Sequence, residues 1–287
     1  MKKILIAGTA FVYVLAMSLG TSEAGTFMIG AKYWYAEWDS AVLEWFEKDI
    51  GAGFKEMGMA LDSDVDRGSG YLAGPLLSYQ TDDGTWAISL AAMAFSHFSQ
   101  DWTGSVGSMA LGTDVDTDRK DFDFAASYSL SKYQDKLSLL KYSKIFAGYK
   151  YQIVDYDLAL NYSTLMGMRR FNYKLDAAVH MPTVGVGFVY PVSDKLVLGL
   201  QAGIGLALID LEMKDSDGNT FDISPGASIT YNGELALTIL PPVKNLLIQL
   251  GFRAQAWYLK ARSPKWWEET ETEDLTWGPT ISAVYTF

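Results

Sequence analysis

The two histidines of the chain are the first place to look for enzymatic chemistry, because proton transfer needs an acid or base with a tuned pKa. His97 stands two residues before Ser99, and His180 stands alone. No acidic partner for His97 and Ser99 is identified: Asp101 lies four residues from His97, and Asp176 lies four residues from His180. We therefore expect no catalytic residue and two interfacial histidines, and keep His97 with Ser99 as the alternative site.

Alternating aspartates are the second candidate for chemistry. Asp62, Asp64 and Asp66 resemble the start of a calcium-binding loop of oxygen ligands. However, Arg67 occupies the sixth position, where that loop needs glycine, and the twelfth position is Ala73. We expect a hydrated loop, no metal site and no cofactor, with loose binding of a divalent cation as the alternative. Similar acidic runs occur at Asp114, Asp116 and Asp118, and at Asp215 and Asp217.

Alternation of apolar and polar residues with a period of two runs through the chain and indicates β-strands. It is clearest at the C-terminus, where one face carries Leu275, Trp277, Pro279, Ile281, Ala283, Tyr285 and Phe287. The alternating segments are about 10–15 residues long, enough to cross a bilayer when tilted, whereas strands of soluble proteins usually have about 5–6. Aromatic residues gather at their ends, as in the interfacial girdles of membrane barrels. A soluble β-protein is the alternative.

The segments number ten, an even number that lets a barrel close with both ends on one side. They are 26–38, 68–80, 85–98, 119–130, 137–152, 176–190, 196–211, 224–240, 245–260 and 274–287. Short connections are expected near 81–84, 131–136, 191–195 and 241–245, and long ones at 39–67, 99–119, 153–175, 212–223 and 261–273. An additional hairpin within 153–175 would raise the number to twelve. The fold class is therefore all-β, a transmembrane up-and-down antiparallel barrel.

The first 24 residues are typical of a cleaved signal peptide: Lys2 and Lys3, an apolar stretch from Ile4 to Leu19, and small residues at Ser22 and Ala24. Residues 25–287 would then form the barrel domain. The net charge of −11 becomes −12 without this segment, which argues against a nucleic-acid partner. There is no cysteine, hence no disulfide and no thiolate metal site. After the signal peptide no apolar run approaches 18 residues, so a helical membrane protein is not expected.

The polar face of each segment would line the lumen of a barrel, with the apolar face toward lipid. Parity assigns to the lumen Lys32, Asp121, Asp123, Lys144, Lys150, Gln201, Asn232, Glu234, Gln249, Arg253 and Gln255. These side chains could select solutes in a narrow channel, or pair with one another and fill it. Barrels of about eight strands are filled by side chains, whereas those of 16–18 strands conduct. Ten strands favour a filled or very narrow lumen.

On these features the whole segment after residue 24 resembles the small bacterial outer-membrane β-barrel (porin-like) proteins. The most specific feature is the last strand, with Ile281, Ala283, Tyr285 and terminal Phe287, which is similar to the signal that the barrel-assembly machinery reads. The resemblance implies a Gram-negative outer membrane, both termini in the periplasm, and lipid, lipopolysaccharide and the assembly machinery as partners. Small polar solutes would be further partners if the lumen conducts.

Two hypotheses for function follow. The first is a non-enzymatic barrel, either a narrow channel or a structural, surface-exposed protein. The second is a lipid-modifying hydrolase, because His97-Phe98-Ser99 is similar to the His-x-Ser spacing of outer-membrane lipid A deacylases. Omptin proteases are a further comparison, but their Asp-x-His pair is missing here. Trp266 and Trp267, with the acidic run from Glu268 to Asp274, indicate an extracellular loop.

The turn around Val243 and Lys244 makes one register prediction. If these two residues are central in a hairpin, Glu234 lies directly opposite Arg253, and parity places both in the lumen. Directly opposed residues have Cβ atoms about 4.5–5.5 Å apart, so we expect Glu234 and Arg253 to form a charge-assisted ion pair.

Overall fold

The computed structural model describes residues 25–56, 58–65, 67–106, 109–164, 167–223, 226–262 and 269–287. The expected signal peptide, Asp66 and the pair Trp266 and Trp267 lie outside these ranges. None of the described helices is long and apolar enough to cross a membrane.

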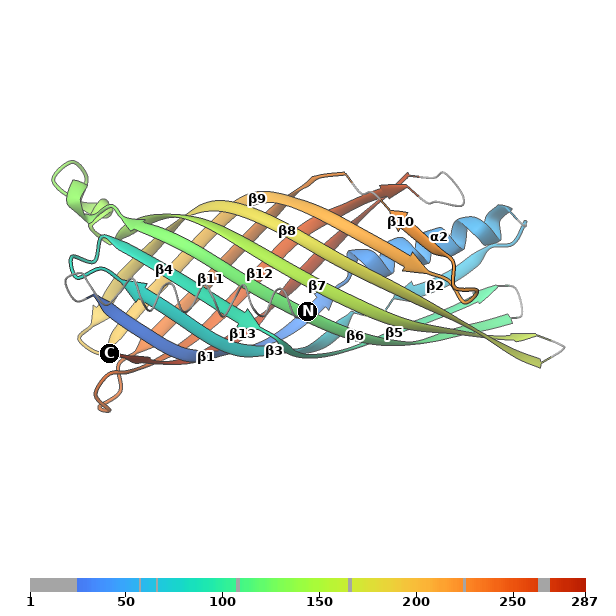
Figure 1. The fold of residues 1–287 in the computed structure, drawn as a ribbon, viewed down its shortest axis with the longest axis horizontal. Coiled ribbons are helices and arrows are strands. Elements are labelled where there is room, and N and C mark those ends of the chain that lie inside the picture. The colour runs from blue at the N-terminus through green and yellow to red at the C-terminus, as the bar shows by residue number, and fades with distance from the viewer. Residues whose placement is uncertain are drawn as a thin grey trace.

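Ten antiparallel strands form a closed up-and-down barrel, and each of them overlaps one of the ten predicted segments (Figure 1). In chain order they are β1 (Thr26–Asp39), β3 (Gly68–Gln80), β4 with β5 (Trp86–Met93 and Phe95–Val106), β6 (Met109–Ser129), β7 (Ser143–Thr164), β8 (Gly167–Ser193), β9 (Leu196–Lys214), β11 (Ser228–Ile239), β12 (Leu246–Arg262) and β13 (Glu269–Thr286). The barrel closes through β1, which pairs on one side with β13 and on the other with β3; Tyr33, for example, lies opposite both Ile281 and Ala73.

The connections differ greatly between the two ends of the barrel. At one end, here called the turn end, lie the connections 81–85, 130–142, 194–195 and 240–245 and both ends of the described chain, where the Phe287 amide donates to the Phe27 carbonyl. At the opposite end, the loop end, the strands continue far beyond the predicted segments. The predicted loop 153–175 is occupied mainly by strand, because β7 and β8 extend through it as one hairpin. The twelve-strand alternative is therefore wrong.

Three connections contain secondary structure that was predicted to be loop or strand. Helix α2 (Ala41–Glu56) and strand β2 (Leu61–Val65) occupy the predicted loop 39–67, and β10 (Thr220–Ile223) adds to β9 in 212–223. At the turn end two 3-10 helices, η2 (Ser131–Tyr133) and η3 (Ser138–Tyr142), delay the start of β7 to Ser143.

Helix α2 begins at a polar cap and places one apolar face on the loop end of the barrel interior. The Leu43 amide donates to Ser40 Oγ at 3.3 Å, as expected for a serine N-cap. Val42, Trp45 and Phe46 are buried at the spacing of an amphipathic helix. Thr272 Oγ1 on β13 donates to the Ala41 carbonyl at 2.8 Å, and this bond fixes the start of the helix against the barrel wall.

A belt of exposed apolar side chains surrounds the half of the barrel nearer the turn end. This half is called the turn half below, and the half nearer the loop end is called the loop half. Its members are between 43 and 61% exposed: Ile29, Ile145, Val184, Val186, Leu200, Ile204, Leu206, Leu235, Leu250, Phe252 and Ile281. Exposed aromatic residues border the belt, toward the turn end Trp86, Tyr190, Tyr285 and Phe287, and toward the loop end Tyr33, Tyr35, Tyr71, Tyr149 and Tyr231. An apolar band between two aromatic girdles is the surface that a transmembrane barrel presents to lipid.

Candidate functional site: the barrel interior

All eleven residues that parity assigned to the lumen lie inside the barrel, but they fall into two layers. Asp121 and Gln255 are almost completely buried at mid-height. Lys150 borders both layers, because it is 7% exposed and also lines the cavity toward the turn end. The other eight line this cavity: Lys32, Asp123, Lys144, Gln201, Asn232, Glu234, Gln249 and Arg253.

The mid-height layer is a network of hydrogen bonds that crosses the lumen, here called the ionic plug. It comprises Arg119, Asp121, Lys150, Gln152, Gln255 and Thr276. Each of these residues is at most 7% exposed, and they come from four strands, β6, β7, β12 and β13. Because their side chains meet across the interior, they close the barrel at this height.

Asp121 is the shared acceptor at the centre of the ionic plug. Arg119 Nε and Nη2 donate to the two carboxylate oxygens of Asp121 at 3.1 Å each, a bidentate arrangement. Lys150 Nζ contacts the same carboxylate at 2.6 Å and also bonds to Gln255 Oε1. Arg119 Nη1 reaches across to Thr276 Oγ1 at 2.8 Å. The guanidinium further stacks over Trp38, 4.9 Å from the ring centroid, so the buried cation is partnered on its face as well.

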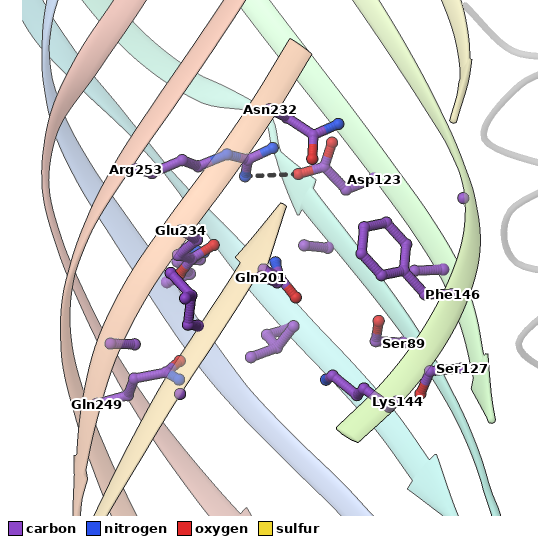
Figure 2. A pocket seen from close by; sticks show the side chains of 18 of the residues that line it. Ser89, Asp123, Ser127, Lys144, Phe146, Gln201, Asn232, Glu234, Gln249 and Arg253 are labelled. Atoms are coloured by element: carbon purple, nitrogen blue, oxygen red, sulfur yellow. Dashed lines mark hydrogen bonds and ion pairs between the residues drawn. The ribbon is translucent and has the colours of Figure 1, made fainter. Parts of the chain in front are cut away.

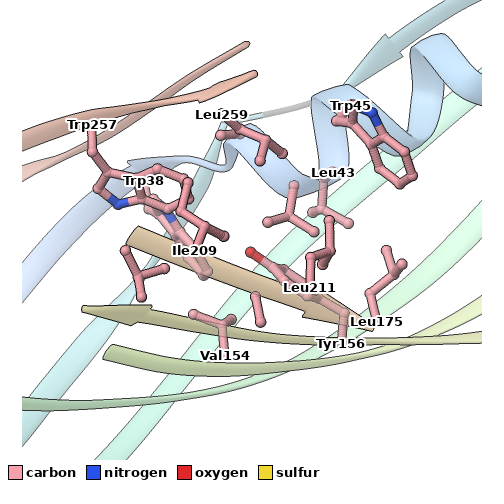
Figure 3. Close-up of a cluster of buried hydrophobic side chains, with 14 of the residues drawn as sticks. Trp38, Leu43, Trp45, Val154, Tyr156, Leu175, Ile209, Leu211, Trp257 and Leu259 are labelled. Carbon is pink, nitrogen blue, oxygen red and sulfur yellow. The ribbon is translucent and has the colours of Figure 1, made fainter. Parts of the chain in front are cut away.

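Between the plug and the loop end, the lumen is filled by apolar side chains. Figure 3 shows this cluster, in which Trp38, Trp257, Leu211 and Tyr156 come from four different strands and Trp45 comes from α2. Trp38 Nε1 donates to Asp274 Oδ2 at 2.8 Å, and the Tyr156 and Ser40 hydroxyls are 2.6 Å apart. The expectation of a polar lumen is therefore wrong for the loop half, where the interior is packed like the core of a soluble protein.

Sequence reasoning missed several of the residues that close the lumen. Arg119 has the same parity as Asp121 and Gln152 the same parity as Lys150, so the alternation could have assigned both to the interior. The apolar cluster could not have been found in this way, because the rule of polar residues inside the barrel does not hold above the ionic plug.

The predicted register of Glu234 and Arg253 is confirmed, but the predicted ion pair between them is wrong. The two residues are direct partners on β11 and β12. Glu234 instead accepts from Lys32 on β1 at 2.7 Å, and Arg253 donates to Asp123 on β6 at 2.8 Å (Figure 2). Both contacts cross the curved interior, which a register between neighbouring strands cannot reveal.

His97 and Ser99 point outward because of a β-bulge at Ala94. Leu76 pairs with Ala91 before the bulge and Ala73 pairs with Phe95 after it, so three residues oppose two. The additional residue reverses parity along the strand, and His97 and Ser99 are exposed on the outer wall. Within the described residues they form no hydrogen bond with each other, and no carboxylate contacts His97.

His180 also faces outward, at the border of the apolar belt. Its Nδ1 is 2.5 Å from Tyr149 Oη, and its Nε2 is 3.8 Å from Asp210 Oδ2. The sequence predicts an interfacial histidine at this position, and that stays a prediction.

The structure also places the candidate metal-binding aspartates and the residues of the C-terminal assembly signal. Asp62 and Asp64 lie on β2, and no group of three or more histidine, aspartate or glutamate side chains in the described ranges could hold a metal ion. Ile281, Tyr285 and Phe287 point to the outside of the barrel, as the final strand pattern predicts; Phe287 is 69% exposed. Ala283 shares their face of β13 and pairs with Ala31 of β1.

Comparison with known proteins supports the fold class. No family model and no curated protein sequence matches the chain. The solved structure of the outer membrane protease OmpT from Escherichia coli is similar, with a TM-score of 0.53 at 11% identity over 93% of this chain and 99% of that one. The translocator domain of the autotransporter NalP from Neisseria meningitidis gives 0.43 at 8% identity, covering 99% and 96%. The closed ten-stranded barrel with its apolar belt has the fold of a small outer-membrane β-barrel.

Proposed function

We propose that this chain is a non-enzymatic outer-membrane barrel that is closed to passage through its lumen and presents its loop end at the cell surface. Of the two non-enzymatic roles, channel or surface-exposed structural barrel, the interior favours the second. The observation that carries the proposal is the ionic plug, in which Arg119, Asp121 and Gln152 are fully buried. The apolar core above it adds a second closed layer.

The orientation in the membrane is part of the same proposal. The turn end, with both ends of the described chain, faces the periplasm, because short turns lie there in outer-membrane barrels and long extensions lie outside. Lipid surrounds the apolar belt, lipopolysaccharide surrounds the outer girdle, and the assembly machinery reads the strand that ends at Phe287.

Single-channel recording in a planar bilayer tests the closed lumen. The refolded full chain should insert, as shown by heat-modifiable migration, and give no discrete current steps. Protein unfolded by heat before addition serves as the control for detergent leakage. Reproducible steps from the folded protein, missing in the control, would overturn the proposal and support a channel.

The alternative hydrolase draws on the outward positions of His97 and Ser99, where a lipid substrate could reach them. Its weakness is that no carboxylate in the described ranges forms an ion pair or hydrogen bond with His97, since a serine nucleophile needs a base that a third group orients. Mass spectrometry of lipid A from cells with the wild-type protein and with Ser99→Ala separates the two functions. An acyl pattern that changes with wild type and not with Ser99→Ala would establish the hydrolase.

A further inference from the structure

A cavity of about 330 Å³ occupies the lumen between the ionic plug and the turn end (Figure 2). We call it the turn-side cavity. Toward the plug it is bounded by Lys150 and Arg253. Toward the rim it is lined by Lys144, Val197 and Thr238, each one residue from the turn-side end of its strand. The cavity therefore reaches the edge of the barrel at one end and is closed at the other. Its volume lies at the lower limit of small-molecule sites, about 300–1,000 Å³.

Missing side chains, and not loose packing, create this space. Gly199 on β9 lines the cavity, and a Cβ built there would have the Ala236 carbonyl oxygen, 3.8 Å away, as its nearest neighbour. Leu198 and Leu200, on either side of Gly199, face the opposite way. Any larger residue at position 199 would thus project into the cavity without a backbone clash. The glycine keeps open a volume that a side chain could fill.

The charges around the cavity are unbalanced toward positive. Four cationic side chains line it against two carboxylates, those of Asp123 and Glu234. Arg253 pairs with Asp123, Lys32 pairs with Glu234, and Lys150 is engaged by Asp121 of the plug. That leaves Lys144, which forms no ion pair or hydrogen bond with any other residue in the described part of the chain. A surplus ammonium inside the barrel stands out in a protein whose net charge is −11.

Amide donors face the same space. Gln201 and Asn232 line the cavity on β9 and β11, and Figure 2 shows both projecting into it above Lys144. Within the described ranges neither side chain has a hydrogen-bond partner. Each amide offers two N–H donors, and the ammonium offers three. Gln201 lies in the same register row as Lys144, because Lys144 pairs with Gly187 and Gly187 pairs with Gln201. Asn232 lies further toward the plug, beside Asp123 and Arg253 in Figure 2. An amide donor in the row of an unpaired cation is chemistry that can hold an oxyanion, because charge-assisted hydrogen bonds are the strong ones.

We propose that the turn-side cavity binds a small oxyanion, a carboxylate or a phosphate group, with Lys144 as its charge partner and Gln201 as a donor. The inference rests on the proposed closed barrel: because the ionic plug blocks further passage, the ligand enters and leaves through the turn end. The site would therefore hold an anion that comes from the side of the membrane that the turn end faces, and would not conduct that anion across the membrane.

Titration calorimetry on the refolded full chain in detergent at low ionic strength tests this site. Inorganic phosphate and succinate, in separate titrations, distinguish phosphate from carboxylate recognition. At least one should bind, and Lys144→Met should weaken that binding about tenfold or more, because it removes a charge-assisted contact. Lys141→Met is the matched control: it removes one charge from an exposed lysine three residues away, outside the lumen. It should bind like wild type.

A second variant guards against a folding defect in Lys144→Met. Gly199→Leu keeps every charge and fills the cavity, so it should abolish binding while heat-modifiable migration stays normal. Equal affinity of wild type and Lys144→Met, or unchanged binding by Gly199→Leu, would overturn the site, as would the failure of both anions to bind wild type.

The two proposals fail in different measurements. Loss of the anion site would appear in calorimetry and would leave the bilayer silent. A lumen open to passage would appear as current steps in the bilayer, with anions passing through and not held, and would overturn the closed barrel itself.

Discussion

Along β8 the interior positions change abruptly in size at mid-height. Toward the loop end Leu175, Val179 and Met181 are buried in the apolar core. Toward the turn end the same face carries Thr183, Gly185 and Gly187. The outer wall changes in the opposite sense, from Asp176 and His180 to the exposed Val184 and Val186. The loop half is thus built like a soluble β-protein, apolar inside and polar outside, and the turn half like a membrane barrel.

In the proposed membrane placement, this inversion marks where the lipid boundary lies and what each half contributes. Burial from water stabilises the loop half, since its interior is the only apolar environment available there. In the proposed membrane placement, lipid covers the turn half from outside, and the interior of that half is free to remain polar and partly open. The ionic plug lies at the transition. We expect substitutions in the plug and loop half to affect stability most, and those in the turn half to affect it less.

The largest expected effect is at the centre of the plug. Asp121→Asn removes the carboxylate that Arg119 and Lys150 share, and leaves two buried cations without it. Breaking a buried ion pair costs about 3–5 kcal/mol, so urea unfolding in lipid vesicles should shift by that amount. Asp123→Asn in the turn half is the matched control, because the side chain of Asp123 is 24% exposed. It should cost about 1–2 kcal/mol, between exposed and buried pairs. Equal losses would contradict the division into two halves.

The next effect tests which wall faces lipid. Leu250→Arg places a charge in the apolar belt, whereas Gln249→Arg adds one to the turn-side cavity. A charged residue near the bilayer midplane costs about 2–4 kcal/mol in a barrel. The same vesicle titration should therefore show the larger loss for Leu250→Arg. A larger loss for Gln249→Arg would mean that the outward and inward faces of the turn half are reversed.

The presence of the ten strands could be predicted from the sequence because alternation is local, and it survives in both halves. The register of β11 with β12 could be predicted as well, because a short turn joins them. Which face is apolar could not be predicted in the same way, since it depends on whether lipid or water lies outside. Contacts across the lumen are equally hidden: the pair of Lys32 and Glu234 joins strands separated by β12 and β13. Helix α2 could have been recognised from Ser40 and the spacing of Val42, Trp45 and Phe46. The bulge at Ala94 has no comparable signal.

A smaller effect is expected for the ion pairs that cross the lumen, and double-mutant cycles measure it. In double-mutant cycles, Glu234→Gln with Lys32→Met should show coupling of about 1 kcal/mol or more, within the range for residues in contact. Glu234→Gln with Arg253→Gln should couple less, because these residues are register partners whose charges pair elsewhere. Stronger coupling of Glu234 with Arg253 than with Lys32 would restore the pair that the sequence predicted.

The smallest expected effect lies outside both halves, in the turn that joins β3 to β4. Thr81 Oγ1, the Thr85 amide and Thr85 Oγ1 all donate to the Asp83 carboxylate, at 2.7, 2.9 and 2.5 Å. These hydrogen bonds hold the pKa of Asp83 well below its ordinary value of 3.8, and the side-chain hydrogen bond from Thr85 has the largest effect. A carboxylate with a depressed pKa contributes its full stabilisation of the folded state when the pH is above its ordinary pKa. This contribution is lost as the pH falls toward the pKa in the folded state. Unfolding titrations from pH 7 down to about 2 should therefore show a shallower acid-side loss for Asp83→Asn than for wild type. Asp82→Asn, one residue earlier in the same turn, should keep the wild-type slope. If Asp82→Asn flattened the slope as much as Asp83→Asn, the general charge of the turn, and not the threonine hydrogen bonds, would be the cause.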